Sequence, residues 1–197
     1  FATYSITGAG AFTIGSGTSG VITASTGGFT GFTSFTANTS STITCTGAAA
    51  FSVAGNVTIS GTYTYSTSVI TTTAAGAFNS SASIYSWIHN AVGLTQTLTT
   101  NGLTAAGVLT ITTGAVDTGA NLALTVTGAT SITGTLTCNA STITAAAVTV
   151  NDGGLYANGI ATSNISGNIV VGGGTSGSIT TGVGTIHIDG TTTIAAG

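Results

Sequence analysis

Charge is almost absent from this sequence. Its 197 residues contain no Lys, Arg or Glu, and the only acidic side chains are those of Asp117, Asp152 and Asp189. Charged residues make up 2% of the chain, against about 25% in an ordinary soluble domain. Without Lys or Arg, no basic patch can bind nucleic acid or an acidic membrane surface, and no lysine can serve a P-loop or a Schiff base. We expect no nucleic-acid partner, no cofactor and no enzymatic activity.

Long apolar runs are also absent. The mean hydropathy is +0.58, yet no stretch of about 18 apolar residues occurs, so we expect no membrane insertion. Disordered chains are rich in charge and poor in β-branched residues, whereas this chain has 46 threonines and 31 glycines. No change of composition divides the chain, so we expect one β-rich domain over residues 1–197, as part of a polymeric assembly.

The absence of proline bears on assembly. Native sheets commonly protect their edge strands with Lys, Pro and other charges, and this chain has neither Lys nor Pro. High β-propensity, little charge and no Pro are typical of cross-β stacking, while frequent Gly fits tight turns. The sequence therefore predicts strands that pair between copies of the chain, and its expected partners are copies of itself in a homopolymer.

Methionine does not occur, and the chain begins at Phe1. We expect that an initiator Met was removed together with a leader, as in an exported protein. The expected location is extracellular, at the cell surface. In that location Asn-x-Ser/Thr sequons can accept glycans. These sequons begin at Asn38, Asn56, Asn79, Asn139 and Asn164.

The clearest local pattern is alternation. In eight Thr-x-Thr segments the middle residue is large and apolar, or Cys. Successive side chains of a strand point to opposite faces, so the threonines should lie on one face and the middle residue on the other. β-Branched side chains favour this extended backbone. The eight middle residues are Ile43, Cys45, Tyr63, Leu98, Ile111, Val126, Leu136 and Ile143.

The predicted strands are short. In the second half of the chain, apolar residues recur mostly at steps of four to nine residues. This rhythm is typical of an all-β stack of short strands, that is, of stacked β-arches or a β-solenoid. A β-sandwich is the competing architecture. The recurring residues are Ile132, Leu136, Ile143, Val148, Leu155, Ile160, Ile165, Val170, Ile179, Ile186 and Ile194.

Residues 80–92 fit either a strand or a short helix. Their isoleucines have helical spacing, but the segment also alternates, with Tyr85, Trp87 and His89 on one side. In so β-rich a chain a strand is favoured, and at most one short helix is expected here. Because this segment holds the only Trp, Tyr85, Trp87 and His89 are the expected anchors of a core or of an interface between subunits.

Cys45 and Cys138 share the context Thr-x-Thr-Cys. By alternation each Cys points toward a packed interior or a sheet interface. Three states remain open: an intrachain disulfide, an interchain disulfide that locks a polymer, and two buried thiols. An intrachain bridge would close a loop of about 94 residues and contribute about 4–5 kcal/mol. No further ligand-type side chain is close in sequence, so we expect no metal site.

His187 and Asp189 alternate onto one side of a predicted strand. Such a pair can imitate part of a hydrolase triad, but no Gly-x-Ser-x-Gly elbow stands between a strand and a helix. We interpret it as a solvent-facing polar pair and predict no catalytic residue. Asp117 and Asp152 precede glycine-containing turns and are interpreted as turn residues.

Over all 197 residues, the composition is rich in Gly, Thr, Ser and Ala, nearly uncharged, and includes few Cys. It resembles that of the sheath proteins of filamentous methanogenic archaea. The resemblance implies an amyloid-like, β-rich tube around chains of cells that resists proteases and detergents. It also implies disulfide cross-links at the two Thr-x-Thr-Cys segments.

Two functions of different classes follow as predictions. The first is a structural subunit of an extracellular polymer, such as a sheath, fibre or surface coat, that assembles by β-stacking between subunits. The alternative is a binding module, either an ice-binding β-solenoid with a flat Thr-rich face or an adhesin-type β-helix.

Overall fold

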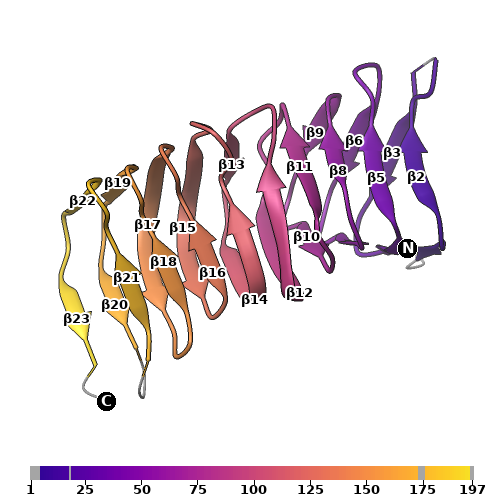
Figure 1. Ribbon diagram of the computed structural model, residues 1–197. Coiled ribbons are helices and arrows are strands. Elements are labelled where there is room, and N and C mark those ends of the chain that lie inside the picture. Colours follow the sequence, from indigo (N-terminus) through magenta and orange to yellow (C-terminus); the bar gives the residue numbers. More distant parts are fainter. Residues whose placement is uncertain (1–4, 18, 173–175, 196–197) are drawn as a thin grey trace.

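The computed structural model describes residues 5–17, 19–172 and 176–195. The chain is all-β and coils into a β-solenoid of about nine turns, as the spacing of its apolar residues predicts. The coils follow one another in a single row, with the N-terminal and C-terminal coils at opposite ends (Figure 1). The described residues form no helix, and hence none that is long and apolar enough to cross a membrane.

Each coil contributes strands to three stacks, which we call faces 1, 2 and 3. Face 1 contains β1 (Ile6–Thr7), β4 (Gly28–Phe32), β7 (Ala50–Val53), β10 (Val69–Thr72), β20 (Ile169–Val171) and β23 (Thr192–Ile194). Face 2 contains β2 (Ala11–Ile14), β5 (Ser34–Ala37), β8 (Val57–Ile59), β11 (Gly76–Ser80), β16 (Thr135–Thr137), β18 (Leu155–Ala157) and β21 (Ser178–Thr180). Face 3 contains β3 (Val21–Ala24), β6 (Thr42–Cys45), β9 (Thr62–Thr64), β13 (Leu103–Ala105), β19 (Thr162–Ile165) and β22 (Thr185–Ile188).

Four longer strands turn a corner and belong to two faces. β12 (Ser86–Leu98) and β14 (Leu109–Asp117) run from face 1 to face 2, and β15 (Leu124–Ile132) and β17 (Thr142–Val150) run from face 3 to face 1. In the fourth coil face 3 is reduced to an isolated bridge between Ile84 and Ala105. The segment that fits a helix or a strand by sequence thus belongs to strands and their connection.

Every strand pair among the described residues is parallel. A β-sandwich is built from antiparallel strands, so this pairing excludes it. Each strand bonds to the equivalent strand of the next coil, about 4.8 Å away along the solenoid axis.

Alternation produces the core, as predicted. All eight middle residues of the Thr-x-Thr segments are buried, and the flanking threonines are half-buried or exposed. Inward side chains of successive coils lie above one another, and Phe29 and Phe51 stack with ring centroids 4.8 Å apart and planes inclined by 3°. Fully burying one large apolar side chain stabilises by about 1.5–3 kcal/mol. The column continues through Ile70, Trp87, Leu109, Thr130, Val148 and Ile169.

Not every apolar residue expected in the core lies there. Leu155 and Val170 are only half-buried because the preceding turns place their neighbours Tyr156 and Val171 inward. Ile160 lies on a corner and is 61% exposed. By contrast, Ile132, Leu136, Ile143, Val148 and Ile165 are buried as expected.

The coils differ in length. Ile6 pairs with Phe29, 23 positions later, while Val69 pairs with Ser86, only 17 positions later. At the other end Leu155 pairs with Ser178, again 23 positions later. The corners absorb these differences, because the paired strands keep their register from coil to coil.

Polar side chains connect neighbouring coils at the corners. Asn101 Nδ2 donates to Asn79 Oδ1 at 2.9 Å, and Asn38 Nδ2 donates to the Gly15 carbonyl at 3.1 Å. The Ala77 amide donates to an asparagine side chain of the preceding coil at 2.9 Å. Neutral hydrogen bonds therefore connect the surfaces of neighbouring coils, where many other proteins have ion pairs.

Glycine permits close contact between the coils. A Cβ at Gly128 would collide with the carbonyl oxygen of Gly107 in the preceding coil. Gly119 lies on a corner with a φ of 66°, where a side chain would also be strained. At Gly10, in contrast, a Cβ would meet nothing within 4 Å, and φ is not in the left-handed region.

We expect Gly128→Ala to lower the free energy of unfolding by about 1–3 kcal/mol, because the added methyl group forces two coils apart. Gly10→Ala is the matched control and should stay within about 0.5 kcal/mol of the wild type. Urea denaturation followed by circular dichroism measures both. Equal stability of Gly128→Ala and the wild type would show that the coils do not touch here.

Candidate functional site

The three aspartates do not converge on one site. Asp117 ends β14, Asp152 lies in the turn after β17, and His187 with Asp189 lies at β22 in the last complete coil. In the part of the chain that the structure describes, no three His, Cys, Asp or Glu side chains gather into a group that could hold a metal ion. The solenoid thus separates the few groups that could support acid–base chemistry.

His187 and Asp189 form an ion-pair geometry on the surface. His187 Nε2 lies 2.9 Å from Asp189 Oδ1, and the two side chains are 67% and 60% exposed. Ile186 and Ile188 point to the inner side of the same strand. The alternation predicted for this segment is therefore present, and both polar side chains face solvent.

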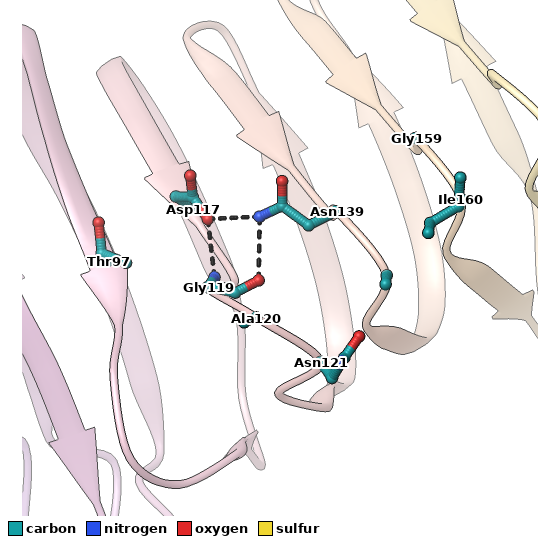
Figure 2. Close-up of a pocket in the computed structure, with 9 residues that line it drawn as sticks. Thr97, Asp117, Gly119, Ala120, Asn121, Asn139, Gly159 and Ile160 are labelled. Carbon is teal, nitrogen blue, oxygen red and sulfur yellow. Dashed lines mark hydrogen bonds between the residues drawn. The ribbon is translucent and has the colours of Figure 1, made fainter.

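A groove of about 650 Å³ runs along the corner between faces 2 and 3 (Figure 2). Asp117 Oδ1 accepts hydrogen bonds from the Gly119 amide at 2.7 Å and from Asn139 Nδ2 at 2.6 Å. Asn139 Nδ2 also donates to the Gly119 carbonyl at 3.0 Å. Asp117 is thus a turn residue, as its sequence context predicts. The other lining residues are Thr97, Ala120, Asn121, Ala140, Gly159 and Ile160.

The corner groove lacks the side chains that usually bind or transform a ligand. Its lining includes no aromatic ring, no cation, and no nucleophile with a neighbouring base. Asp117 Oδ1 is already bound to two donors. Because Asn139 has a φ of 50°, its side-chain bond to Asp117 helps to stabilise a left-handed corner. The groove is therefore explained by the geometry of the turn.

Trp87 and His89 belong to the core, which is one of the two places that the sequence predicted for them. Both side chains are 0% exposed, because β12 turns them toward the axis. Trp87 Nε1 donates to Thr72 Oγ1 at 2.9 Å, and this oxygen lies 2.9 Å from His89 Nδ1. Tyr85 is half-buried, with its ring centroid 6.3 Å from that of Tyr65.

The surroundings of His89 select one neutral tautomer. His89 Nε2 lies 3.2 Å from the carbonyl oxygen of Leu94, which can only accept. Nε2 therefore carries the proton, and Nδ1 accepts from the Thr72 hydroxyl. Burial lowers the pKa of His89, although the bond to the Leu94 carbonyl opposes this shift.

The cysteines are two buried thiols, which is one of the three states that the sequence left open. Cys45 and Cys138 are unpaired and 3% and 0% exposed. Cys45 ends β6 in the second coil and Cys138 follows β16 in the seventh, so five coils, or about 24 Å, separate them. A disulfide requires Cα atoms within about 7 Å. Both thiols also lie inside the solenoid and not at the surface that another copy could contact.

Each Cys belongs to a buried polar cluster that alternation alone does not predict. Cys45 Sγ lies 3.8 Å from Tyr63 Oη, which lies 2.9 Å from the Ser68 hydroxyl. The second cluster repeats this arrangement: Cys138 bonds to Tyr156, whose Oη lies 2.6 Å from Ser163 Oγ. In both clusters the Tyr follows the Cys by 18 residues, one coil further on. The repeated Cys-to-Tyr spacing is the feature of the sequence from which the clusters could have been predicted. Because the buried polar atoms of each cluster have hydrogen-bond partners, the clusters are part of the core and not reactive centres.

The five sequon asparagines are not equally accessible. Asn38 and Asn139 use their Nδ2 atoms, the atoms that would carry a glycan, in hydrogen bonds to the preceding coil. Asn79 is half-buried, whereas Asn56 and Asn164 are exposed. Among the five, Asn56 and Asn164 have the geometry most open to modification.

The two ends of the solenoid are its most distinctive surfaces. Within the described residues, β1, β2 and β3 pair on one side only, and so do β21, β22 and β23. Four of the eight large apolar side chains exposed in this part of the chain lie on these coils. They are Ile6 at 44%, Val21 at 70%, Val183 at 86% and Ile194 at 76% exposed. Each end of the described stack, here called an open end, therefore combines strands paired on one side only with exposed apolar side chains.

No family of known proteins, no curated protein and no solved structure matches this chain. The open ends, the threonine-covered faces and the buried clusters are therefore interpreted from their own geometry. Of these features, only the open ends and the threonine-covered faces are accessible to another molecule.

We expect the free energy of unfolding to fall as the pH drops below about 6.5. The unfolded chain takes up a proton on His89 near that pH, while the folded protein, with its lowered pKa, keeps the imidazole neutral. This contribution is complete above the unfolded pKa and is lost as the pH falls through the folded pKa. The slope is at most about 1.4 kcal/mol per pH unit.

Urea denaturation between pH 7.5 and 5 measures this slope. His89→Gln should remove it, and His187→Gln, which changes an exposed imidazole, should retain it. A wild-type stability that is constant over this range would contradict the buried neutral state of His89.

We expect neither thiol to react with a thiol reagent in the folded protein and both to react after denaturation. Burial raises the pKa of Cys45 and raises that of Cys138 to about 12, so neither forms the reactive thiolate at neutral pH. Spectrophotometric thiol titration measures this, with urea-unfolded protein as the control. Rapid labelling of one thiol per chain without urea would place that Cys at the surface.

Proposed function

We propose that this protein is a structural subunit of an extracellular protein polymer, such as a sheath, fibre or surface coat. Its subunits associate by β-stacking, and its role is mechanical rather than catalytic. The observation that carries this proposal is the parallel stack of coils, whose outermost described strands pair on one side only. An unpaired, apolar strand edge is a template for pairing with another chain.

The lack of charge supports the same function. Edge strands are usually blocked by Lys, Pro or other charges, and the chain contains no Lys and no Pro. A formal charge of −3 over 197 residues provides little repulsion between copies. A chain without Lys or Arg also offers no site to trypsin-like proteases, which suits a long-lived extracellular material.

We expect the protein to form a sedimentable assembly with parallel cross-β structure. Stacked coils repeat at about 4.8 Å along the assembly axis, so aligned material should give a meridional reflection at that spacing. Negative-stain electron microscopy and fibre diffraction measure shape and spacing. Protein that stays monomeric at millimolar concentration in analytical ultracentrifugation would refute the polymer function.

A second function is supported by the threonine-covered faces. On face 3, Thr42 and Thr62 are neighbours in one outward column, and Thr44 and Thr64 in the next. Such columns place hydroxyl and methyl groups about 4.8 Å apart between coils and about 6.6 Å apart along a strand. A regular array of this kind can order water, as an ice-binding surface requires.

The threonine array is short, which favours the structural function. The fourth coil has no strand on face 3, and the column that begins at Thr104 ends in Asn164 and His187. Thermal hysteresis of a soluble monomer measures ice binding directly. Its absence would remove this second function without affecting the first.

A further inference from the structure

We propose that copies of this protein also associate side by side, with a protruding apolar loop of one copy seated in the corner groove of the next. The loop comprises residues 91–94 and is called the corner loop below; the groove is the one drawn in Figure 2. The inference rests on the proposed polymer function and adds a lateral contact between filaments of stacked subunits. The occupant of the corner groove is therefore the corner loop of a second copy of this chain.

The corner loop is an insertion in β12, at the corner between faces 1 and 2. Asn90 pairs with Thr113 and Thr95 pairs with Ala115, so four residues of β12 stand opposite a single residue of β14. A strand pair in register has no room for the additional residues. They therefore protrude from the corner.

The corner loop presents apolar side chains to solvent. Val92 is 82% exposed and Leu94 is 44% exposed. Gly93 lies between them with a φ of 67°, and a Cβ at this position would meet nothing within 4 Å. Contact of this loop with a second apolar surface removes apolar area from water, which favours association.

The coils around the corner loop hold it in one shape. His89 Nε2 donates to the Leu94 carbonyl oxygen at 3.2 Å, and Thr113 Oγ1 donates to Asn90 Oδ1 at 2.9 Å. Ala91 is buried, with 4% of its surface exposed. A loop that is already ordered loses little conformational entropy when it binds.

The corner groove lies next to a column of exposed apolar side chains, which we call the apolar column. The same left-handed turn recurs in four successive coils, at Gly119, Asn139, Gly159 and Gly182. These residues lie above one another along the axis. The residue after each of them is apolar and exposed, and the first three of these residues line the groove (Figure 2). The apolar column consists of Ala120, Ala140, Ile160 and Val183.

The groove fits an uncharged apolar occupant. Its volume of about 650 Å³ falls within the range of about 300–1,000 Å³ in which proteins bury small molecules, so it accommodates two aliphatic side chains. The one carboxylate in its lining, that of Asp117, already accepts two hydrogen bonds at Oδ1. The corner loop contains no charged residue, so seating it buries no new charge.

The positions of loop and groove permit a continuous row of copies. Each coil runs from face 1 through face 2 to face 3, so the corner loop and the groove lie at opposite borders of face 2. Two copies with parallel axes and coplanar faces 2 bring the loop of one against the groove of the next. An apolar protrusion that fits a pocket elsewhere on the same molecule makes a heterologous contact, and such contacts repeat without closing. The product is a layer one solenoid thick, which suits a sheath or coat.

The contact also sets an axial offset between neighbouring copies. The groove extends over four coils, from the coil of Thr97 to that of Ile160, and the corner loop lies in the first of these. The groove centre is therefore about one and a half coils further along the axis, or about 7 Å. Class averages of the layer from electron micrographs should show this stagger. Neighbouring filaments without any stagger would contradict the contact.

A single contact of this kind is weak. Its core is formed by two side chains, whereas a stable complex buries about 800 Å² on each partner. Two separate copies should therefore dissociate. Between two filaments the contact recurs once per subunit, and the contacts then act together. Lateral association should accordingly follow stacking and not precede it.

Two charge variants test the contact from both sides. Val92→Asp changes the corner loop and Ile160→Asp changes the groove, and each would bury an unpaired carboxylate at the contact. We expect both variants to form separate filaments and to lose the layers that the wild type forms in electron micrographs. Val108→Asp is the matched control, because Val108 is exposed but lies between faces 3 and 1, away from both surfaces. This variant should form layers as the wild type does.

Cross-linking identifies the two surfaces directly. The native thiols are buried, so a Val92→Cys variant and an Ala140→Cys variant each add the only thiol exposed among the described residues. In a mixed assembly, mild oxidation should join one chain of each variant, since a disulfide requires Cα atoms within about 7 Å. Val108→Cys in place of Val92→Cys is the control and should give no such product.

The other outcomes separate the two proposals. Dimers of Ala140→Cys alone would show that groove meets groove, and dimers of Val92→Cys alone that loop meets loop; either result overturns the inference. Layers formed by Val92→Asp as by the wild type, or wild-type filaments that never associate laterally, also overturn it and leave the polymer function standing. Wild-type protein that never assembles would refute the polymer function itself.

Discussion

Parallel pairing of each coil with the next is the constraint on which the rest of the structure depends. A strand in this solenoid must keep its register with the strands before and after it, since a slip of one residue exchanges the inner and outer side chains. Thr-x-Thr segments satisfy this demand because alternation and β-branching favour the same extended backbone. Glycine at the corners lets neighbouring backbones approach closely enough to keep the strands in register, as at Gly128 and Gly107.

The absence of charge follows from the same constraint. In a solenoid the side chains of one outward column lie about 4.8 Å apart, and two like charges at about 4 Å repel by about 1 kcal/mol even in water. Neutral polar groups avoid this cost and can bond along the axis, as Asn101 does to Asn79. The core also uses neutral polar groups in place of charges. In the hydrogen-bonded chain Trp87–Thr72–His89, the neutral imidazole has a partner at each nitrogen.

The fold was more predictable from the sequence than the placement of single residues. Alternation around residues such as Ile43 and Leu136 predicts which side chains are buried, because strand geometry alone decides it. Corner lengths are not encoded in that pattern, so Leu155 and Val170 were expected to be buried but lie only half-buried. The distance between Cys45 and Cys138 likewise depends on how many coils separate them, which only the structure reveals.

The candidate site was even less visible in the sequence, for a physical reason. The outermost described strands have no motif: they resemble the strands of every other coil, and they differ only in pairing on one side. Stability in such arrays is approximately a sum of repeat and nearest-neighbour terms. In the proposed polymer, β-stacking between copies would therefore stabilise in the same way as stacking within the chain, less the entropy lost on association. Stacking of this kind requires no interface beyond the fold itself, and the absence of edge-blocking residues is sufficient to permit it.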